Sequence, residues 1–221
     1  MTAQQIDPID RTGVGPRLIV PAAAFLLLYL SVDFVSPNVA SSPAPRPNAP
    51  AAEVRAWLVE NPLAMSLTSA LQLASVVALA VFVVALGSVA GAAYRARAAG
   101  LIAAACMVLS SLLGWVLAAV APSVSDGVAG GLRTANFIAG GTAHVAALGV
   151  FVLLASRLDL FGRGMRVFAW VAAVPAVASL VSLAVYEGAA LIPLGRLLCM
   201  IWIVVAAITV SVRVARRQQV R

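Results

Sequence analysis

The sequence predicts an all-α integral membrane protein, a bundle of six transmembrane helices, and three observations lead to this class. Of the 221 residues, 62% are hydrophobic and only 10% are charged, whereas a soluble domain carries about 25% charged residues. The apolar residues form six continuous runs, each close to the length of about 20 residues that crosses a bilayer. The runs do not alternate between apolar and polar positions, which argues against the strands of a membrane barrel.

The six predicted spans form one membrane domain over residues 17–212, between a cytoplasmic tail (1–16) and a basic cytoplasmic tail (213–221). The first run is interpreted as a retained span, because it is longer than the apolar region of about 7–15 residues in a secretory signal. The predicted spans are Arg17–Val35, Ala64–Ala90, Ala99–Ala121, Thr134–Ser156, Met165–Tyr186 and Leu191–Val212.

The positions of the arginines predict the orientation. The chain has a net charge of +7 and all 15 of its basic residues are arginines, a bias typical of GC-rich, bacterial genes. Eleven lie in the two tails and in alternate loops, three lie on the opposite side and Arg196 lies within a span. Because cytoplasmic loops are enriched in positive charge, both termini are predicted to be cytoplasmic, in the cell membrane. Charges spread over short loops indicate contact with membrane lipids rather than nucleic acid.

The first outer loop, residues 36–63, is the only long segment outside the predicted spans. Its first half is rich in proline and is expected to be extended. In the following stretch, "AAEVRAWLVENP", the apolar residues Val54, Trp57 and Leu58 share one helical face. This pattern predicts a short amphipathic helix at the outer membrane interface, with Trp57 as its anchor. Such a helix is either a linker into the second span or a lid over an outer-facing cavity.

Glu187 and Arg196 stand nine positions apart at the outer end of the hairpin between the fifth and sixth spans. An ionisable side chain at the centre of a membrane helix costs about 2.5–3.5 kcal/mol on insertion scales, and such a residue is a functional hypothesis by default. Two readings follow. Either the two side chains form an ion pair that clasps the hairpin, or they contact a ligand.

Further polar residues lie in the outer halves of the spans, whereas the inner halves are mainly Ala, Val and Leu. If these residues face one another, they form a polar pocket that is open to the outer side. His144, near the midplane, is either the floor of this pocket or a packing residue that Gly140 and Gly141 bring close to a neighbouring helix. A single His predicts no metal site, and no cofactor motif is present. The candidate ligand-binding residues are Arg196, Glu187, His144, Asp33, Gln72, Trp115, Asn136 and Tyr186.

Three functional hypotheses remain open. The first is a protein that binds, or binds and transports, a small amphipathic or anionic molecule through the outer pocket. The second is an intramembrane enzyme that acts on a lipid or isoprenoid by acid catalysis, by analogy with terpenoid cyclases, with Asp33, Glu187 and His144 as candidate catalytic groups. The third is a membrane scaffold or assembly subunit. Gly87 and Gly91, a GxxxG pair in the second span, are expected to mediate a homo-oligomer contact.

Overall fold

A computed structural model describes residues 14–90 and 93–219, and every regular element within these ranges is helical. Six helices there are long and apolar enough to cross a membrane. The predicted class, an all-α multi-pass membrane protein, is therefore confirmed. The predicted N-terminal tail lies largely outside the described residues.

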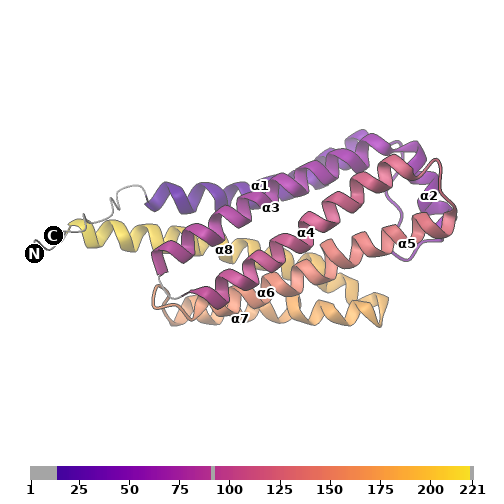
Figure 1. Ribbon diagram of the computed structural model, residues 1–221. Coiled ribbons are helices and arrows are strands. Elements are labelled where there is room, and N and C mark those ends of the chain that lie inside the picture. Colours follow the sequence, from indigo (N-terminus) through magenta and orange to yellow (C-terminus); the bar gives the residue numbers. More distant parts are fainter. Residues whose placement is uncertain (1–13, 91–92, 220–221) are drawn as a thin grey trace, which may run out of the picture.

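Figure 1 shows the spanning helices running side by side along one direction. Three of them are compound rods: α5, η1 and α6 follow one another without a break, α7 continues into η2, and η3 leads directly into α8. The elements are α1 (Val14–Val39), α2 (Ala51–Glu60), α3 (Pro62–Ala90), α4 (Tyr94–Val120), α5 (Asp126–Phe137), η1 (Ile138–Ala143), α6 (His144–Ser156), α7 (Arg163–Ala178), η2 (Ser179–Leu183), η3 (Tyr186–Ala190) and α8 (Leu191–Gln219).

The fourth span begins eight residues before its predicted start at Thr134. Ser125 caps this end, because its side-chain oxygen accepts a hydrogen bond from the Val128 backbone N–H at 3.4 Å, and Asp126 follows in the first turn. A serine cap and an early acidic residue both stabilise a helix start. Hydropathy alone missed this extension, because it lies in a polar sequence.

The spanning helices form a ring in which neighbours in sequence pack side by side, and α8 closes the ring against α1. The fourth span is the central one. In its most apolar stretch of 18 residues, 61% of the residues are buried inside the protein, whereas the corresponding share in the other five spans is 28–39%. Its second half, α6, contacts α4, α7 and α8. Several polar residues of this central rod, among them Asn136, Thr142 and His144, are buried inside the protein and away from lipid.

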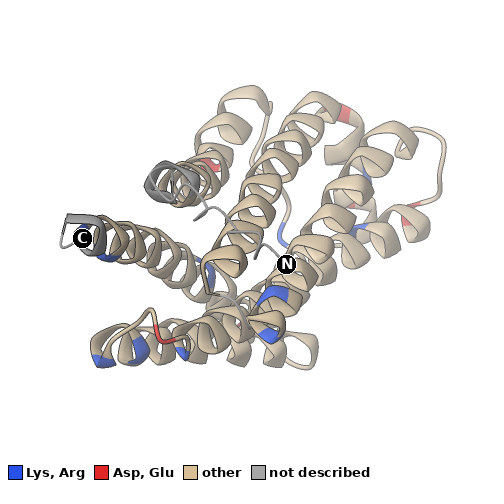
Figure 2. Ribbon diagram, turned by 60° about the vertical axis from the view of Figure 1, so that its left-hand side comes forward, with Lys and Arg blue, Asp and Glu red and all other residues tan. Residues whose placement is uncertain are grey.

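Both described ends of the chain lie at the same end of the bundle, here called the terminal end (Figure 1). The arginines at the start of α4, in the turn between α6 and α7 and at the end of α8 belong to this end. Figure 2 turns it toward the viewer and shows these basic positions at the helix ends. This arrangement agrees with the charge pattern on which the predicted cytoplasmic orientation depends.

The opposite end carries a cap, defined as residues 40–61, which comprises α2 and the segment before it. The apolar face of α2 packs on the ends of α3 and α4 in a small core of its own. Arg55 ties α2 to the turn after α4: its Nε donates to the Ala121 carbonyl at 2.9 Å, and it forms an ion pair with Asp126 at 3.7 Å.

Trp57 does not have the predicted role of a membrane anchor. The amphipathic helix forms, but the Trp57 side chain is only 8% exposed, and its indole N–H donates to the Ser42 carbonyl at 2.9 Å. The apolar face of α2 thus packs onto the protein. The sequence pattern reports an apolar face, and it does not say whether protein or lipid covers that face.

Candidate functional site

Arg196 lies near the start of α8 and is buried, with 9% of its surface exposed. Its Nη2 donates a hydrogen bond to the Gly140 carbonyl, and its guanidinium lies over the Tyr29 ring, 4.6 Å from the ring centre. Its Nε–H is buried and has no hydrogen-bond partner among the residues that the structure describes. Three elements of the ring, α1, η1 and α8, therefore meet at one cation.

Small residues position Arg196. The preceding residue, Gly195, lies so close to α7 that an added Cβ would be 2.5 Å from the Cα of Ala176. Gly149 approaches Ala176 from α6, where an added Cβ would be 2.9 Å from the Ala176 Cβ. Small residues let membrane helices approach closely. This contact sets the rotation of α8 and turns Arg196 toward the central rod.

Gly140, the acceptor for Arg196, belongs to the π-helical segment η1. An added Cβ at Gly140 would lie 2.6 Å from the Ser110 Cβ and closer still to the Ser110 Oγ, so this turn is in tight contact with α4. Thr142 shares a hydrogen bond of 3.0 Å with Ser182 of η2. A π-helical turn inside an α-helix is rare and frequently marks a functional site.

Asn136 lies one turn closer to the cap and links the central rod to α4. Its Nδ2 donates to the Ser110 carbonyl at 2.7 Å and to the Ser110 Oγ at 3.0 Å, while the Ser110 hydroxyl donates to the Asn136 carbonyl. Arg133 donates to the Asn136 Oδ1 at 3.1 Å. The Asn136 side chain is therefore fully engaged within the protein, as expected of a residue that joins two helices.

His144 lies one turn deeper than Gly140 and is fully buried. Its Nδ1 is 2.8 Å from the Ala103 carbonyl of α4. Its Nε2 is buried and has no hydrogen-bond partner within the described ranges of the chain. Of the two readings of this residue, the packing contact to a neighbouring backbone is present, and the second ring nitrogen remains open.

The predicted ion pair between Glu187 and Arg196 is wrong. Glu187 and Asp33 are both exposed on the outside of the protein, and the ion pair found among the side chains that the structure describes joins Arg55 to Asp126. The two helices of the hairpin place Glu187 on the surface and Arg196 inside the ring. Arg196 is consequently a buried cation without a carboxylate partner in the described part of the chain.

The other predicted residues are divided between packing and the surface. The Trp115 indole N–H donates to the Ser66 carbonyl at 3.0 Å and joins α4 to α3. Gln72 and Tyr186 are half-buried. The structure therefore gathers Arg196, Asn136 and His144 along the central rod, and the remaining candidates lie elsewhere.

Sequence reasoning missed two partners of Arg196. Tyr29 is one aromatic residue within an apolar run, and nothing in its position identifies it as the ring beneath a cation. The Gly140 carbonyl is a backbone group, which a search for functional side chains does not consider. The pair Gly140-Gly141 was the available signal, because it marked close helix approach at this level.

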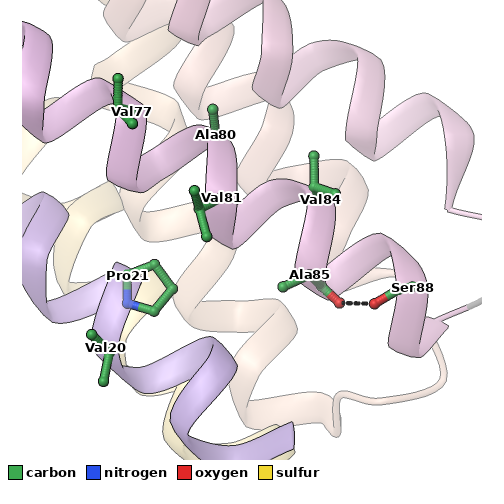
Figure 3. A pocket seen from close by; sticks show the side chains of 8 residues that line it. All are labelled: Val20, Pro21, Val77, Ala80, Val81, Val84, Ala85 and Ser88. Carbon is green, nitrogen blue, oxygen red and sulfur yellow. Dashed lines mark hydrogen bonds between the residues drawn. The ribbon is translucent and has the colours of Figure 1, made fainter. Parts of the chain in front are cut away.

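A separate groove of about 870 Å³ lies between α1 and α3, toward the terminal end. Figure 3 shows its aliphatic lining, in which the Ser88 hydroxyl is already bonded to the Ala85 carbonyl at 2.7 Å. The groove therefore offers no free polar side chain and differs from the predicted polar pocket. It is lined by Val20, Pro21, Val77, Ala80, Val81, Val84, Ala85 and Ser88.

Gly87 lies next to this groove on α3, and an added Cβ there would be 3.6 Å from the Arg97 Cδ of the same chain. Its proposed partner in the GxxxG pair, Gly91, lies outside the described residues. Within the described part of the chain, no group of three or more His, Cys, Asp or Glu side chains is placed to hold a metal ion.

No protein family, curated protein or solved structure matches the chain. The six apolar helices and the closed ring define the class, a polytopic membrane protein. Its particular function has to be inferred from the site, because a helical bundle hosts many activities.

Proposed function

We propose that this protein binds a small anionic molecule, or an amphipathic molecule with an anionic head, in the half of the bundle near the cap. Arg196 is the anion contact. The observation that carries the proposal is a buried guanidinium that has no carboxylate partner among the described residues and whose buried Nε–H has no hydrogen-bond partner there. Buried charges in proteins are normally paired or bound to an ion of opposite sign.

The contacts of Arg196 support a site that is ready for an anion. A cation over an aromatic ring gains about 0.5–2 kcal/mol, and a hydrogen bond to a charged group contributes about 1.5–3 kcal/mol. Together these offset the insertion cost of about 2.5–3.5 kcal/mol. They leave the net positive charge and the Nε–H unmatched, and an anion supplies both missing interactions.

The depth of the site indicates access from the outer side. From Gly140 to Ser156 the rod rises about 24 Å at about 1.5 Å per residue, and the hydrocarbon core is about 30 Å thick. The charge pattern predicts that Ser156 lies near the inner boundary of the hydrocarbon core. Gly140, and with it Arg196, which donates to its carbonyl, then lies about 6 Å below the outer boundary.

The inner half of the bundle is filled by apolar side chains. Phe82 and Phe151 meet edge to face with ring centres 6.4 Å apart. Next to them, an added Cβ at Gly100 would lie 2.6 Å from Val83. This packing favours binding over free passage, and transport would require α3, α4 and α6 to separate at this level.

The enzymatic alternative is less well supported. Intramembrane acid catalysis needs a carboxyl group held in apolar surroundings within the site, and Asp33 and Glu187 are exposed at the protein surface. The scaffold alternative makes a different prediction, because in that case Arg196 only stabilises the bundle.

The test is mass spectrometry of small molecules that co-purify with the wild type, with Arg196→Gln and with Arg163→Gln. Arg163 is an exposed arginine at the terminal end and serves as the matched control. We expect an anionic molecule with the wild type and Arg163→Gln, and its loss from a monodisperse, helical Arg196→Gln. If Arg196→Gln unfolds while nothing co-purifies with the wild type, Arg196 is structural and the proposal fails.

A further inference from the structure

We infer that the anion bound at Arg196 also carries a hydrogen-bond donor, a hydroxyl or N–H group, which His144 accepts through Nε2. This inference rests on the proposed function and specifies its ligand class. Two buried polar atoms without partners carry it: the Arg196 Nε, which can only donate, and the His144 Nε2, whose role follows from the other ring nitrogen.

The hydrogen bond at Nδ1 assigns the tautomer of His144. Nδ1 is 2.8 Å from the Ala103 carbonyl oxygen, and a carbonyl oxygen can only accept. Nδ1 therefore carries the proton. In a neutral imidazole one nitrogen donates and the other accepts, so Nε2 presents a bare lone pair and requires a donor.

No donor in the described part of the chain lies within hydrogen-bond distance of the His144 Nε2. Ser110 donates to the Asn136 carbonyl, Ser111 donates to the Met107 carbonyl, and Thr142 is bonded to Ser182. A buried acceptor without a partner is costly. The donor for the His144 Nε2 therefore has to come from outside the described chain, either from a ligand or from a buried water.

The spacing of the two open groups describes the ligand. Arg196 binds at Gly140, and His144 follows four residues later on the same rod. Four residues of helix correspond to a rise of about 6 Å, which is the axial separation of these two levels. The chemistry is thus a phosphate or carboxylate with a hydroxyl or N–H a few bonds away, present either on a lipid headgroup or on a free solute.

Matched probe pairs test this class, with affinity measured for the full chain. Phosphatidylglycerol and phosphatidylpropanol in nanodiscs test a lipid source. Glycerol 3-phosphate against propyl phosphate, and 3-hydroxybutyrate against butyrate, test free phosphates and carboxylates. We expect the hydroxylated member of one pair to bind about 3- to 10-fold more tightly, the contribution of one hydrogen bond. The pair that shows the preference identifies the source.

Two substitutions separate the ligand bond from the packing bond. In His144→Asn, an amide N–H takes the position from which Nδ1 donates to the Ala103 carbonyl, and no atom occupies the position of Nε2. In His144→Gln, the longer side chain brings an amide oxygen near the position of Nε2. We expect His144→Asn to fold and to bind both members of the pair equally. His144→Gln should recover part of the preference.

The outcomes distinguish this inference from the proposed function. If the wild type binds both members of every pair equally and Arg196→Gln abolishes binding, the anion site is retained. A buried water then donates to the His144 Nε2, and the inference is wrong. If His144→Asn keeps the hydroxyl preference, the inference is also wrong. If the wild type binds none of the six probes, both the inference and the anion site are rejected.

Discussion

The contact between the central rod and α4 can be tested with Gly140→Ala. The new Cβ would lie 2.6 Å from the Ser110 Cβ, whereas carbon atoms in contact are about 3.5–4.0 Å apart. The helices must therefore separate by about 1 Å. Overpacking of this kind costs about 1–3 kcal/mol.

Separation also weakens the three hydrogen bonds between Ser110 and Asn136, each worth about 0.6 kcal/mol in a membrane protein. The better helix propensity of Ala returns up to about 1 kcal/mol. The net loss expected for Gly140→Ala is about 1–4 kcal/mol in the free energy of unfolding. It is measured by titration with a denaturing detergent and followed by circular dichroism.

Two second-site variants make the test specific. Ser110→Gly removes both clashing atoms and should restore much of the stability of Gly140→Ala. Ser110→Ala removes only the hydroxyl and leaves the Cβ at 2.6 Å, so it should restore little. Equal rescue by the two variants, or no loss in Gly140→Ala alone, would refute this account of the contact.

Two further predictions concern other contacts. Gly195→Ala should destabilise the fold by about 1–3 kcal/mol or more, because the new Cβ meets the α7 backbone. The control is Gly164→Ala, which should leave the stability unchanged because a Cβ there has nothing within 4 Å. Similar denaturation midpoints for the two variants would contradict the α7–α8 contact. In the cap, Arg55→Gln should speed hydrogen exchange in α2 more than Asp126→Asn does. The exposed ion pair contributes at most about 1 kcal/mol, whereas Arg55 also donates hydrogen bonds to two backbone carbonyls. Equal exchange rates in the two variants would refute the role given to those hydrogen bonds.

The sequence alone predicted the class, the number of spans and the presence of α2. These depend on one-dimensional properties, namely the length of each apolar run, the positions of prolines and arginines, and the spacing of Val54, Trp57 and Leu58. It also predicted the approximate depth of Arg196 and His144, because depth follows from counting residues along a helix. Confirmation by the structure extends to the helical class and the six spans.

Only the tertiary structure decided which faces meet. A helix in lipid is apolar on all sides, so its sequence contains little periodicity that reports rotation about its axis. Rotation is set instead by close contacts such as those of Gly140 and Gly195, which place Arg196 inside the ring and leave Glu187 on the surface. For the same reason the pairing of Arg196 with Tyr29 and a backbone carbonyl appeared only when the helices were assembled.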